Sequence, residues 1–134
     1  AFRTRPGVED TVVIGSSMGG VISLHAWLTR PDVFGHAGIM SPAFWTNAGF
    51  SLRQAQEAPL PAGRVWVDIG GRESPEFPDR MRAYWDEAHT FADTLSARGL
   101  GERVRFQADP EAPHHESAWA ARLPAALRFL LTGL

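Results

Sequence analysis

Four short segments along the chain contain either a run or an alternation of apolar residues, and they are bounded by residues typical of turns. They span residues 11–14, 37–40, 64–69 and 103–107. The first three are mostly continuous apolar runs, a pattern typical of strands that are buried on both faces. The fourth alternates polar and apolar residues, which is the pattern of a half-buried strand. We therefore predict four β-strands.

Three further segments have the composition and spacing of helices. The first covers residues 21–30 and is stopped by Pro31, because proline does not continue a helix. The second carries one apolar stripe over residues 81–95, and Gly99 follows as its C-terminal stop. The third covers residues 116–131. We therefore predict three helices that alternate with the strands.

The order of these elements predicts the fold class. Residues 41–62 are proline-rich in patches and predict a loop, and Pro124 is expected to start or kink the second half of the last helix. The chain then has the order β-α-β-loop-β-α-β-α. Strands that alternate with helices indicate an α/β fold, with a mostly parallel sheet flanked by helices and right-handed crossovers. We see no internal repeat and expect a single domain over residues 1–134.

Composition excludes several classes of function. The 134 residues suffice for one domain with a core, and 44% hydrophobic with 21% charged residues excludes a disordered chain. No apolar run approaches the roughly 20 residues of a membrane span. A net charge of -2 without a basic cluster argues against a nucleic-acid partner. The absence of cysteine excludes disulfides, thiolate zinc sites and a cysteine nucleophile.

The strongest chemical motif directly follows the first predicted strand. Residues 15–19 read Gly-Ser-Ser-Met-Gly, which matches G-x-S-x-G between a buried strand and a helix. Such a turn pushes Ser17 out at the strand end and needs small residues two before and two after it. The same turn aims the Met18 N–H toward a developing oxyanion. A glycine-rich turn without catalytic role fits the same letters, but the strand–helix context favours a nucleophile.

A serine nucleophile needs a carboxylate that follows a later strand of the same sheet. Glu73 lies in the loop expected after the strand at residues 64–69. Asp68 falls within that strand, so we expect its side chain to face a surface of the sheet. Glu76 and Asp79 lie further along and compete for the same role. Glu73 is the preferred acid.

The general base should follow the last strand, where two histidines are adjacent. His114 and His115 both satisfy this requirement, and chemistry alone does not choose between them. A metal site made of these two histidines and Glu116 is the rival interpretation, but no second ligand cluster or H-E-x-x-H helix supports it. We therefore expect no metal and no cofactor. The remaining histidines lie within predicted helices or at a strand start: His25, His36 and His89.

These motifs are similar to the C-terminal half of the esterase branch of the α/β-hydrolases. That branch includes feruloyl esterases, S-formylglutathione hydrolase, enterochelin-type siderophore esterases and mycolyltransferases. The matching stretches, in order over nearly the whole chain, are residues 15–20, 30–35, 41–45, 67–73, 114–119 and 122–130. The resemblance implies that Ser17 is the nucleophile and Glu73 the triad acid. The family's histidine stands two residues before a Glu and five before a Trp, which selects His114.

The resemblance also implies that half of the fold lies outside this sequence. The chain begins at Ala1 without an initiator Met, and we expect it to be a partial domain that starts just before the nucleophile strand. Family members carry four earlier strands, and a loop there supplies the second oxyanion N–H. The strand at residues 11–14 would then be an open edge. We expect this edge to be covered by a second copy or by the missing half.

The sequence therefore predicts a serine carboxylic-ester hydrolase with a Ser-Glu-His triad and an acyl-enzyme intermediate. Its partner would be a small-molecule ester, and Trp45 would line the substrate pocket. An acyltransferase or a peptidase of the same fold uses the same residues. A non-catalytic or inactive fragment of the fold is the alternative from another class. Neither the acyl group nor the cellular compartment is readable from these residues.

Overall fold

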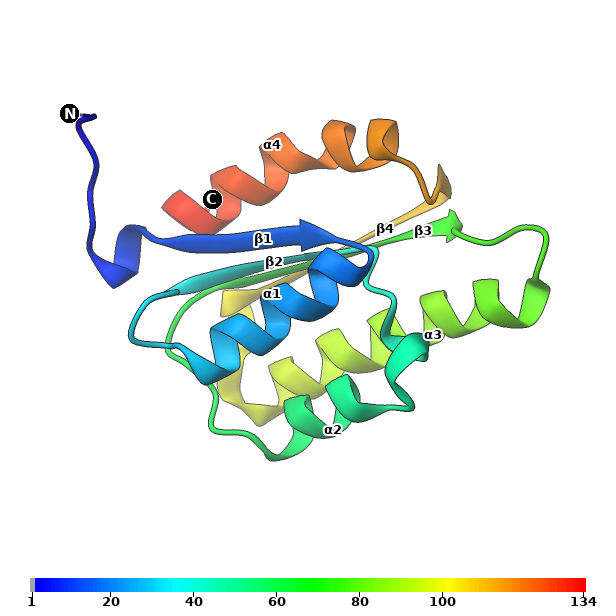
Figure 1. The fold of residues 1–134 in the computed structure, drawn as a ribbon, viewed down its shortest axis with the longest axis horizontal. Helices are drawn as coiled ribbons and strands as arrows, with labels where there is room; N and C mark the ends of the chain where they lie inside the picture. The colour runs from blue at the N-terminus through cyan, green and yellow to red at the C-terminus, as the bar shows by residue number, and fades with distance from the viewer. Residues whose placement is uncertain (1) are drawn as a thin grey trace.

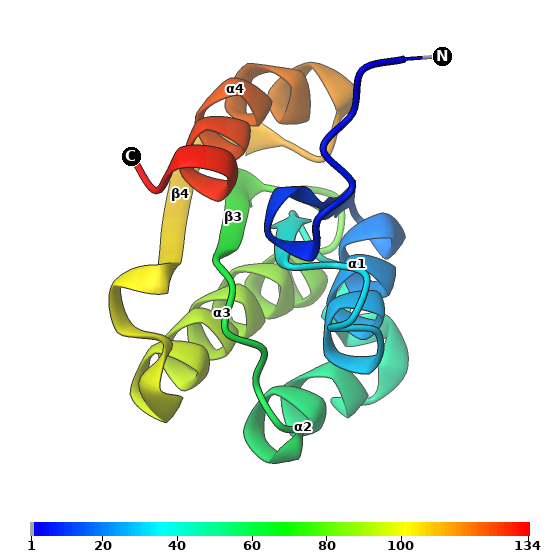
Figure 2. The same ribbon diagram turned by 90° about the vertical axis from the view of Figure 1, so that its left-hand side faces the viewer.

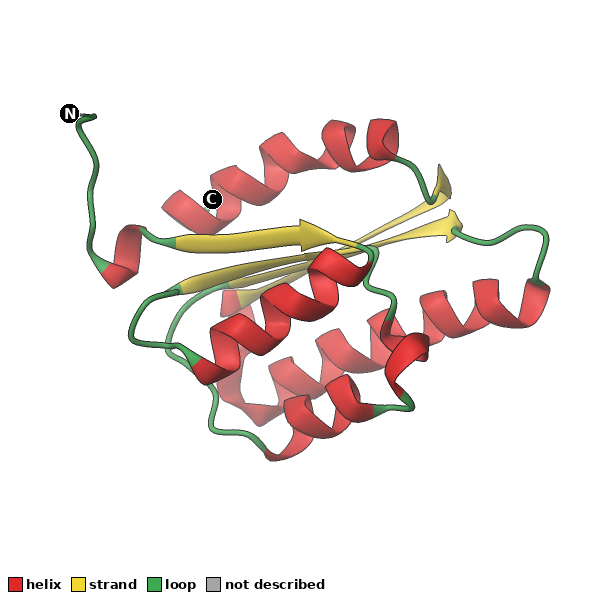
Figure 3. Ribbon diagram, in the orientation of Figure 1, coloured by secondary structure: helices red, strands yellow, loops and turns green. Residues whose placement is uncertain are grey.

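A four-stranded parallel sheet forms the centre of the molecule in the computed structural model, which describes residues 2–134 (Figure 1). The strands are β1 (Val12–Ser16), β2 (His36–Met40), β3 (Val65–Arg72) and β4 (Val104–Pro113), in the spatial order β1-β2-β3-β4. The helices are α1 (Met18–Thr29), α2 (Phe50–Glu57), α3 (Pro78–Leu95) and α4 (Glu116–Thr132). The predicted α/β class is confirmed (Figure 3).

Helices cover both faces of the sheet unequally. α1, α2 and α3 lie on one face, while α4 lies alone on the other (Figure 2). The larger core, between the sheet and the three helices, contains the buried side chains of Trp27, Phe44 and Phe91. The smaller core under α4 contains Trp66 and Phe129. Across residues 2–134, no helix is both long and apolar enough to cross a membrane.

All four strands point the same way, so their C-terminal ends meet at one edge of the sheet. The register pairs Ser16 with Met40 and Met40 with Asp68. The residues directly after β1, β3 and β4 are therefore brought together at this edge. This is where ligands bind in open α/β sheets.

Two predicted strands are longer in the structure than in the sequence analysis. β3 continues through Gly70 and Gly71 to Arg72, and β4 continues through the predicted loop at residues 108–112. The glycines permit this because a side chain on either would collide with the β4 backbone. β4 is the last strand of the sheet, where prolines are tolerated because one side needs no ladder hydrogen bond.

The prediction of a loop over residues 41–62 was wrong in part. This segment contains a 3₁₀ turn (Phe44–Asn47) and the helix α2. Ala48 and Gly49 both have left-handed φ angles, of 51° and 77°, and they turn the chain from one element into the next. The prolines near both ends of this segment favoured a loop, and a helix of only two turns was therefore not predicted.

The structure can be compared with the predicted helix start at residue 21 and with the two predicted breaks, at Gly99 and Pro124. α1 starts at Met18, directly after the turn, instead of residue 21. α3 ends at Leu95 and passes into a π-helical turn, where Gly99 has a φ of 103°. α4 is one helix with Pro124 inside it. Gly99 therefore ends the helical segment as predicted, while Pro124 does not start a new one.

Candidate active site

The turn between β1 and α1 holds Ser17 in a conformation that is rare for a residue with a side chain. Its φ is 57° and its ψ is -121°, and such backbone strain costs on the order of 1–3 kcal/mol. Hydrogen bonds hold both sides of the residue: the Ser17 N–H donates to the Met40 carbonyl at 2.9 Å, and its carbonyl accepts from the Ala43 N–H at 3.2 Å. β2 and the segment after it thus fix the turn.

The glycines around this turn have unequal steric roles. A Cβ on Gly15 would lie 2.6 Å from the Gly19 backbone, and a Cβ on Gly20 would lie 3.1 Å from the Met40 carbonyl oxygen. A Cβ on Gly19 would meet no described atom within 4 Å. The requirement for a small residue therefore holds at Gly15, whereas at Gly19 the described residues do not impose it.

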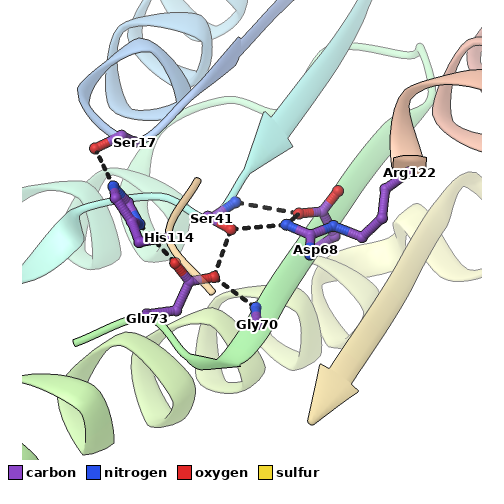
Figure 4. A network of polar contacts seen from close by, with 7 residues as sticks. All are labelled: Ser17, Ser41, Asp68, Gly70, Glu73, His114 and Arg122. Carbon is purple, nitrogen blue, oxygen red and sulfur yellow. Dashed lines mark hydrogen bonds and ion pairs between the residues drawn. The ribbon is translucent and has the colours of Figure 1, made fainter. Parts of the chain in front are cut away.

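Ser17, His114 and Glu73 form one chain of hydrogen bonds (Figure 4). His114 Nε2 lies 2.8 Å from Ser17 Oγ, and His114 Nδ1 lies 2.5 Å from Glu73 Oε2. A carboxylate only accepts, so the Nδ1 nitrogen carries the proton and the Nε2 lone pair faces the serine hydroxyl. The Glu73 side chain is fully buried, whereas that of His114 is 24% exposed.

Two aromatic rings fix the plane of the His114 imidazole. Tyr84 of α3 lies with its ring centre 5.1 Å from that of His114, and Trp119 of α4 lies at 5.0 Å with its plane almost perpendicular. The ring is therefore held from both helical layers. Thermal rotation that would break either hydrogen bond is restricted.

The second oxygen of Glu73 leads into a buried polar network that the sequence analysis missed. Glu73 Oε1 accepts from the Gly70 N–H at 2.6 Å and from the Ser41 hydroxyl at 2.5 Å. Ser41 Oγ in turn lies 2.8 Å from Arg122 Nη2, which pairs with Asp68 Oδ1 at 3.0 Å. Figure 4 shows these contacts running from the serine at one end to the ion pair at the other.

Asp68 lies inside β3, and its side chain faces α4, as expected from its place in the strand. Burial raises the pKa of Asp68, and the Arg122 guanidinium and the Trp66 indole N–H oppose that rise. Two signals in the sequence point to this pair: a carboxylate within an apolar strand and an arginine on the core side of the last helix. Buried charges of this kind need a partner.

Met18 and Trp45 occupy the rim of the site. Met18 is the first residue of α1, so its N–H has no acceptor within the helix and is free to donate elsewhere. Met18 is 51% exposed, and its sulfur lies 3.4 Å from the Thr46 hydroxyl oxygen, whose proton is donated to the Ala43 carbonyl at 2.7 Å. Trp45 packs edge-on against Tyr84, with ring centres 5.9 Å apart. Tyr84 also packs against His114, so the Tyr84 ring connects Trp45 to the His114 imidazole.

The competing residues lie elsewhere. The imidazole of His115 caps α4 by accepting from the Ser117 N–H, and its side chain is mostly exposed beside Glu116. Glu76, in the loop before α3, and Asp79, in its first turn, are both exposed. Within residues 2–134 no group of three or more His, Asp or Glu side chains converges in a way that could hold a metal ion.

Comparison with known proteins places the chain in a family. The family described as "Putative esterase" matches residues 1–130. The chain belongs to this esterase family. An uncharacterized protein, YbbA, of Bacillus subtilis is 29% identical over 120 residues, which are 88% of this chain and 48% of that protein. The esterase-family assignment thus rests on nearly the entire chain.

Solved structures share the fold of this esterase-family chain. Enterochelin esterase from Shigella flexneri is 25% identical with a TM-score of 0.76, over 96% of this chain and 32% of that one. S-formylglutathione hydrolase from Staphylococcus aureus is 20% identical with a TM-score of 0.69, over 98% and 55%. The chain therefore spans about half or less of the length of these relatives.

Proposed function

We propose that this chain carries the reacting groups of a serine carboxylic-ester hydrolase. The observation that supports it best is the continuous contact from Ser17 Oγ through the His114 imidazole to Glu73, at 2.8 Å and 2.5 Å. Ser17 is the proposed nucleophile, His114 the general base and Glu73 the residue that orients the imidazole. Membership of the esterase family supports ester bonds as the bonds that are cleaved.

In the proposed acylation step, Ser17 Oγ attacks the ester carbonyl carbon while its proton moves to His114 Nε2. Glu73 stabilises the imidazolium that forms, and the Met18 N–H donates to the carbonyl oxygen as it becomes an oxyanion. The imidazolium then gives its proton to the departing alcohol. This leaves the acyl group on Ser17.

In the second half of the reaction, a water molecule loses a proton to His114 and attacks the acyl-enzyme. The tetrahedral intermediate collapses, the acid is released, and Ser17 recovers its proton from His114. An acyltransferase would differ only in that an alcohol replaces water at this step. We propose water as the acyl acceptor.

The proposed site is bordered by an open strand edge. β1 is the last strand on its side of the described sheet, and a hollow of about 310 Å³ opens beside it, lined in part by Ile14, Trp119 and Leu123. We infer that this edge pairs with another strand, and that the partner supplies the second oxyanion donor beside Met18. A second copy of the chain, or the segment present in the longer relatives, fits this requirement.

Trp45 is proposed as a wall on the substrate side of the site. The neighbouring Thr46 contacts the Met18 side chain, so this turn borders the serine. An apolar or aromatic part of the ester would pack there against the partly buried Trp45 and the exposed Met18.

The test is covalent labelling of the 134-residue chain with a fluorophosphonate, followed by intact-mass analysis and peptide mapping. We expect one adduct, on Ser17, that is absent from the Ser17→Ala and His114→Ala variants. The adjacent Ser16→Ala variant is the matched control and should label normally. An acyl-enzyme of the expected mass, trapped from an activated ester at low pH, tests the intermediate.

Labelling that persists in Ser17→Ala, or a wild-type chain that is folded by circular dichroism but unreactive, would contradict the proposal. A faster turnover on adding a simple alcohol, with transfer of the acyl group to it, would favour the acyltransferase instead.

A further inference from the structure

We propose that Ser41 and Arg122 are positioning residues, through which the buried Asp68–Arg122 ion pair acts on Glu73 and His114. This inference rests on the proposed function, because it assigns a role around the same reacting groups. Ser41 is fully buried, and the Arg122 side chain is 3% exposed. Neither residue contacts Ser17 in the contacts described, so both act through Glu73.

The direction of each hydrogen bond in the network is fixed by chemistry. Arg122 has donors only, so Ser41 Oγ accepts from its Nη2 at 2.8 Å. The single hydroxyl proton of Ser41 is then left for Glu73 Oε1 at 2.5 Å. Donation runs from Arg122 through Ser41 to Glu73, while the other Glu73 oxygen holds the His114 Nδ1–H.

The backbone at Ser41 supports a role in positioning rather than simple packing. Its φ is 39°, in the left-handed region that costs energy for a residue with a Cβ. Asp68 stabilises this conformation through two contacts with the Ser41 N–H, which donates to the Asp68 Oδ1 at 3.2 Å and to the Asp68 backbone carbonyl at 3.0 Å. The strained residue thus directs its hydroxyl at the one Glu73 oxygen that does not face the histidine.

The charges of Arg122 and Asp68 should influence the protonation of His114 in opposite directions. Arg122 lies between two carboxylates: it pairs directly with Asp68 and reaches Glu73 through one hydroxyl. Its Nε and Nη1 are buried and have no hydrogen-bond partner in the structure, so Nη2 makes the polar contacts described for this side chain. Removing the positive charge would favour protonation of the nearby His114, and removing the Asp68 charge would oppose it.

Other charged groups near the site are exposed or differently placed. Tyr84 of α3 faces the His114 ring. On the strand side, Arg72 pairs with Glu111 at the surface, and at the start of α4 His115 lies beside Glu116 in an exposed position. Solvent screens these surface pairs. The Arg122 guanidinium and the Asp68 carboxylate are therefore the buried charged groups that the described contacts connect to Glu73 through Ser41.

The experiment measures the rate of Ser17 labelling by a fluorophosphonate between about pH 5 and pH 9. The rate should rise with pH as His114 loses its proton, and we call this part of the profile the rising limb. We expect Arg122→Gln to move the rising limb to higher pH and Asp68→Asn to move it to lower pH, each by about half a unit or more. The double variant Asp68→Asn with Arg122→Gln should return the limb close to its original position. Opposite shifts that cancel are not expected from loss of packing.

Ser41→Ala keeps both buried charges and removes only the connecting hydroxyl. We expect it to label about tenfold more slowly, with the limb at higher pH. Ser51→Ala is its control, because Ser51 is an equally buried serine that bonds Asn47 outside the network. A folded Ser41→Ala that labels like Ser51→Ala would overturn the inference, even if the charge variants do not fold.

Two outcomes separate this inference from the proposed function. The wild-type chain could label on Ser17 while both single charge variants leave the rising limb in place or move it in the same direction. That result would overturn the role of Ser41 and Arg122 but not the proposed esterase function. If the folded wild-type chain does not label on Ser17, both fall.

Discussion

The two edges of the sheet differ in how they deal with unpaired backbone groups. β4 carries charged side chains and prolines along its length: Arg105, Asp109, Pro110, Glu111 and Pro113. β1 carries neither a charge nor a proline in the sequence Val-Val-Ile-Gly-Ser. Charges and prolines are the means by which proteins prevent a strand edge from pairing with another chain. By this criterion the β4 edge has the features of an edge that faces solvent, and the β1 edge lacks them, which supports our proposal that β1 is paired.

The same contrast divides the candidate site. Glu73 and His114 follow β3 and β4, where they are held by a buried network and two aromatic rings. Ser17 and Met18 follow β1, where the rim is half-exposed and apolar. In our proposal this chain supplies the groups that transfer the proton, and a partner on β1 supplies the second oxyanion donor.

The largest effect should come from the side of the site built on β3 and β4. Glu73→Gln keeps the shape of the side chain but removes the charge that selects the imidazole tautomer. We expect the rate of Ser17 labelling to fall by roughly 10⁴-fold, as for the equivalent change in a serine protease. Glu76→Gln, an exposed carboxylate nearby, is the control. Similar rates for the two variants would show that the acid is misassigned.

A charge placed on the β1 edge should weaken association of the chain. We expect the wild-type chain to sediment as a dimer or larger species at micromolar concentration, and Val12→Lys to raise the dissociation constant by at least about tenfold. Gln107→Lys places the same charge on β4 and should change nothing. A wild-type chain that is monomeric at all concentrations would contradict pairing of β1 with a second copy.

Paired glycine substitutions should sharpen the contrast within the turn beside β1. Gly15→Ala forces a Cβ into the Gly19 backbone, so we expect it to lower the free energy of unfolding by about 1–3 kcal/mol. Gly19→Ala meets open space in a helix and should leave stability unchanged or raise it by up to about 1 kcal/mol. Urea unfolding of both variants measures the difference. Equal losses would mean that the turn is packed differently.

The smallest effect concerns His36, which joins the segment before β1 to the segment before β3. Its Nδ1 accepts the Arg64 N–H at 2.9 Å, so its Nε2 carries the proton for the Glu9 carbonyl at 3.0 Å. Burial lowers the pKa of His36 in the folded protein. The unfolded chain therefore takes up a proton first, and stability contributed by neutral His36 is present above about pH 6.5 and declines below it.

Urea midpoints between pH 7.5 and pH 5 test this dependence. The His36→Gln variant should lose part of the decline on acidification, whereas the exposed His25→Gln should retain all of it. A wild-type midpoint that rises as pH falls through 6.5 would reverse the assigned sign.

Much of this architecture could be predicted from local sequence, because the pattern of each strand and helix reports its own burial. The apolar run before Gly15 and the stripe over residues 81–95 each specify one element, and both elements are present. The extension of β4 and the helix α2 could not be read in this way. Proline normally interrupts a strand, and only the position of β4 at the sheet edge removes that penalty.

The positions of the candidate residues Ser17 and Glu73 could be predicted, because each directly follows a strand that its own sequence pattern indicates. Chemistry left His114 and His115 equivalent, and the fold distinguishes them: the first faces Ser17 and the second caps α4. The contact between Ser41 and Arg122 was missed because the two residues lie 81 positions apart in sequence. No local pattern encodes that distance.

The order of the residues along the chain has a consequence during synthesis on the ribosome. Ser17 is made 97 residues before the imidazole that it contacts, and Arg122 follows later still. A nascent chain can therefore form β1, α1 and their turn while the serine remains an ordinary alcohol. Reactivity would appear only when β4 and α4 have been translated and have docked. A labelled Ser17 would thus report that translation has passed the last helix and that the chain has folded behind it.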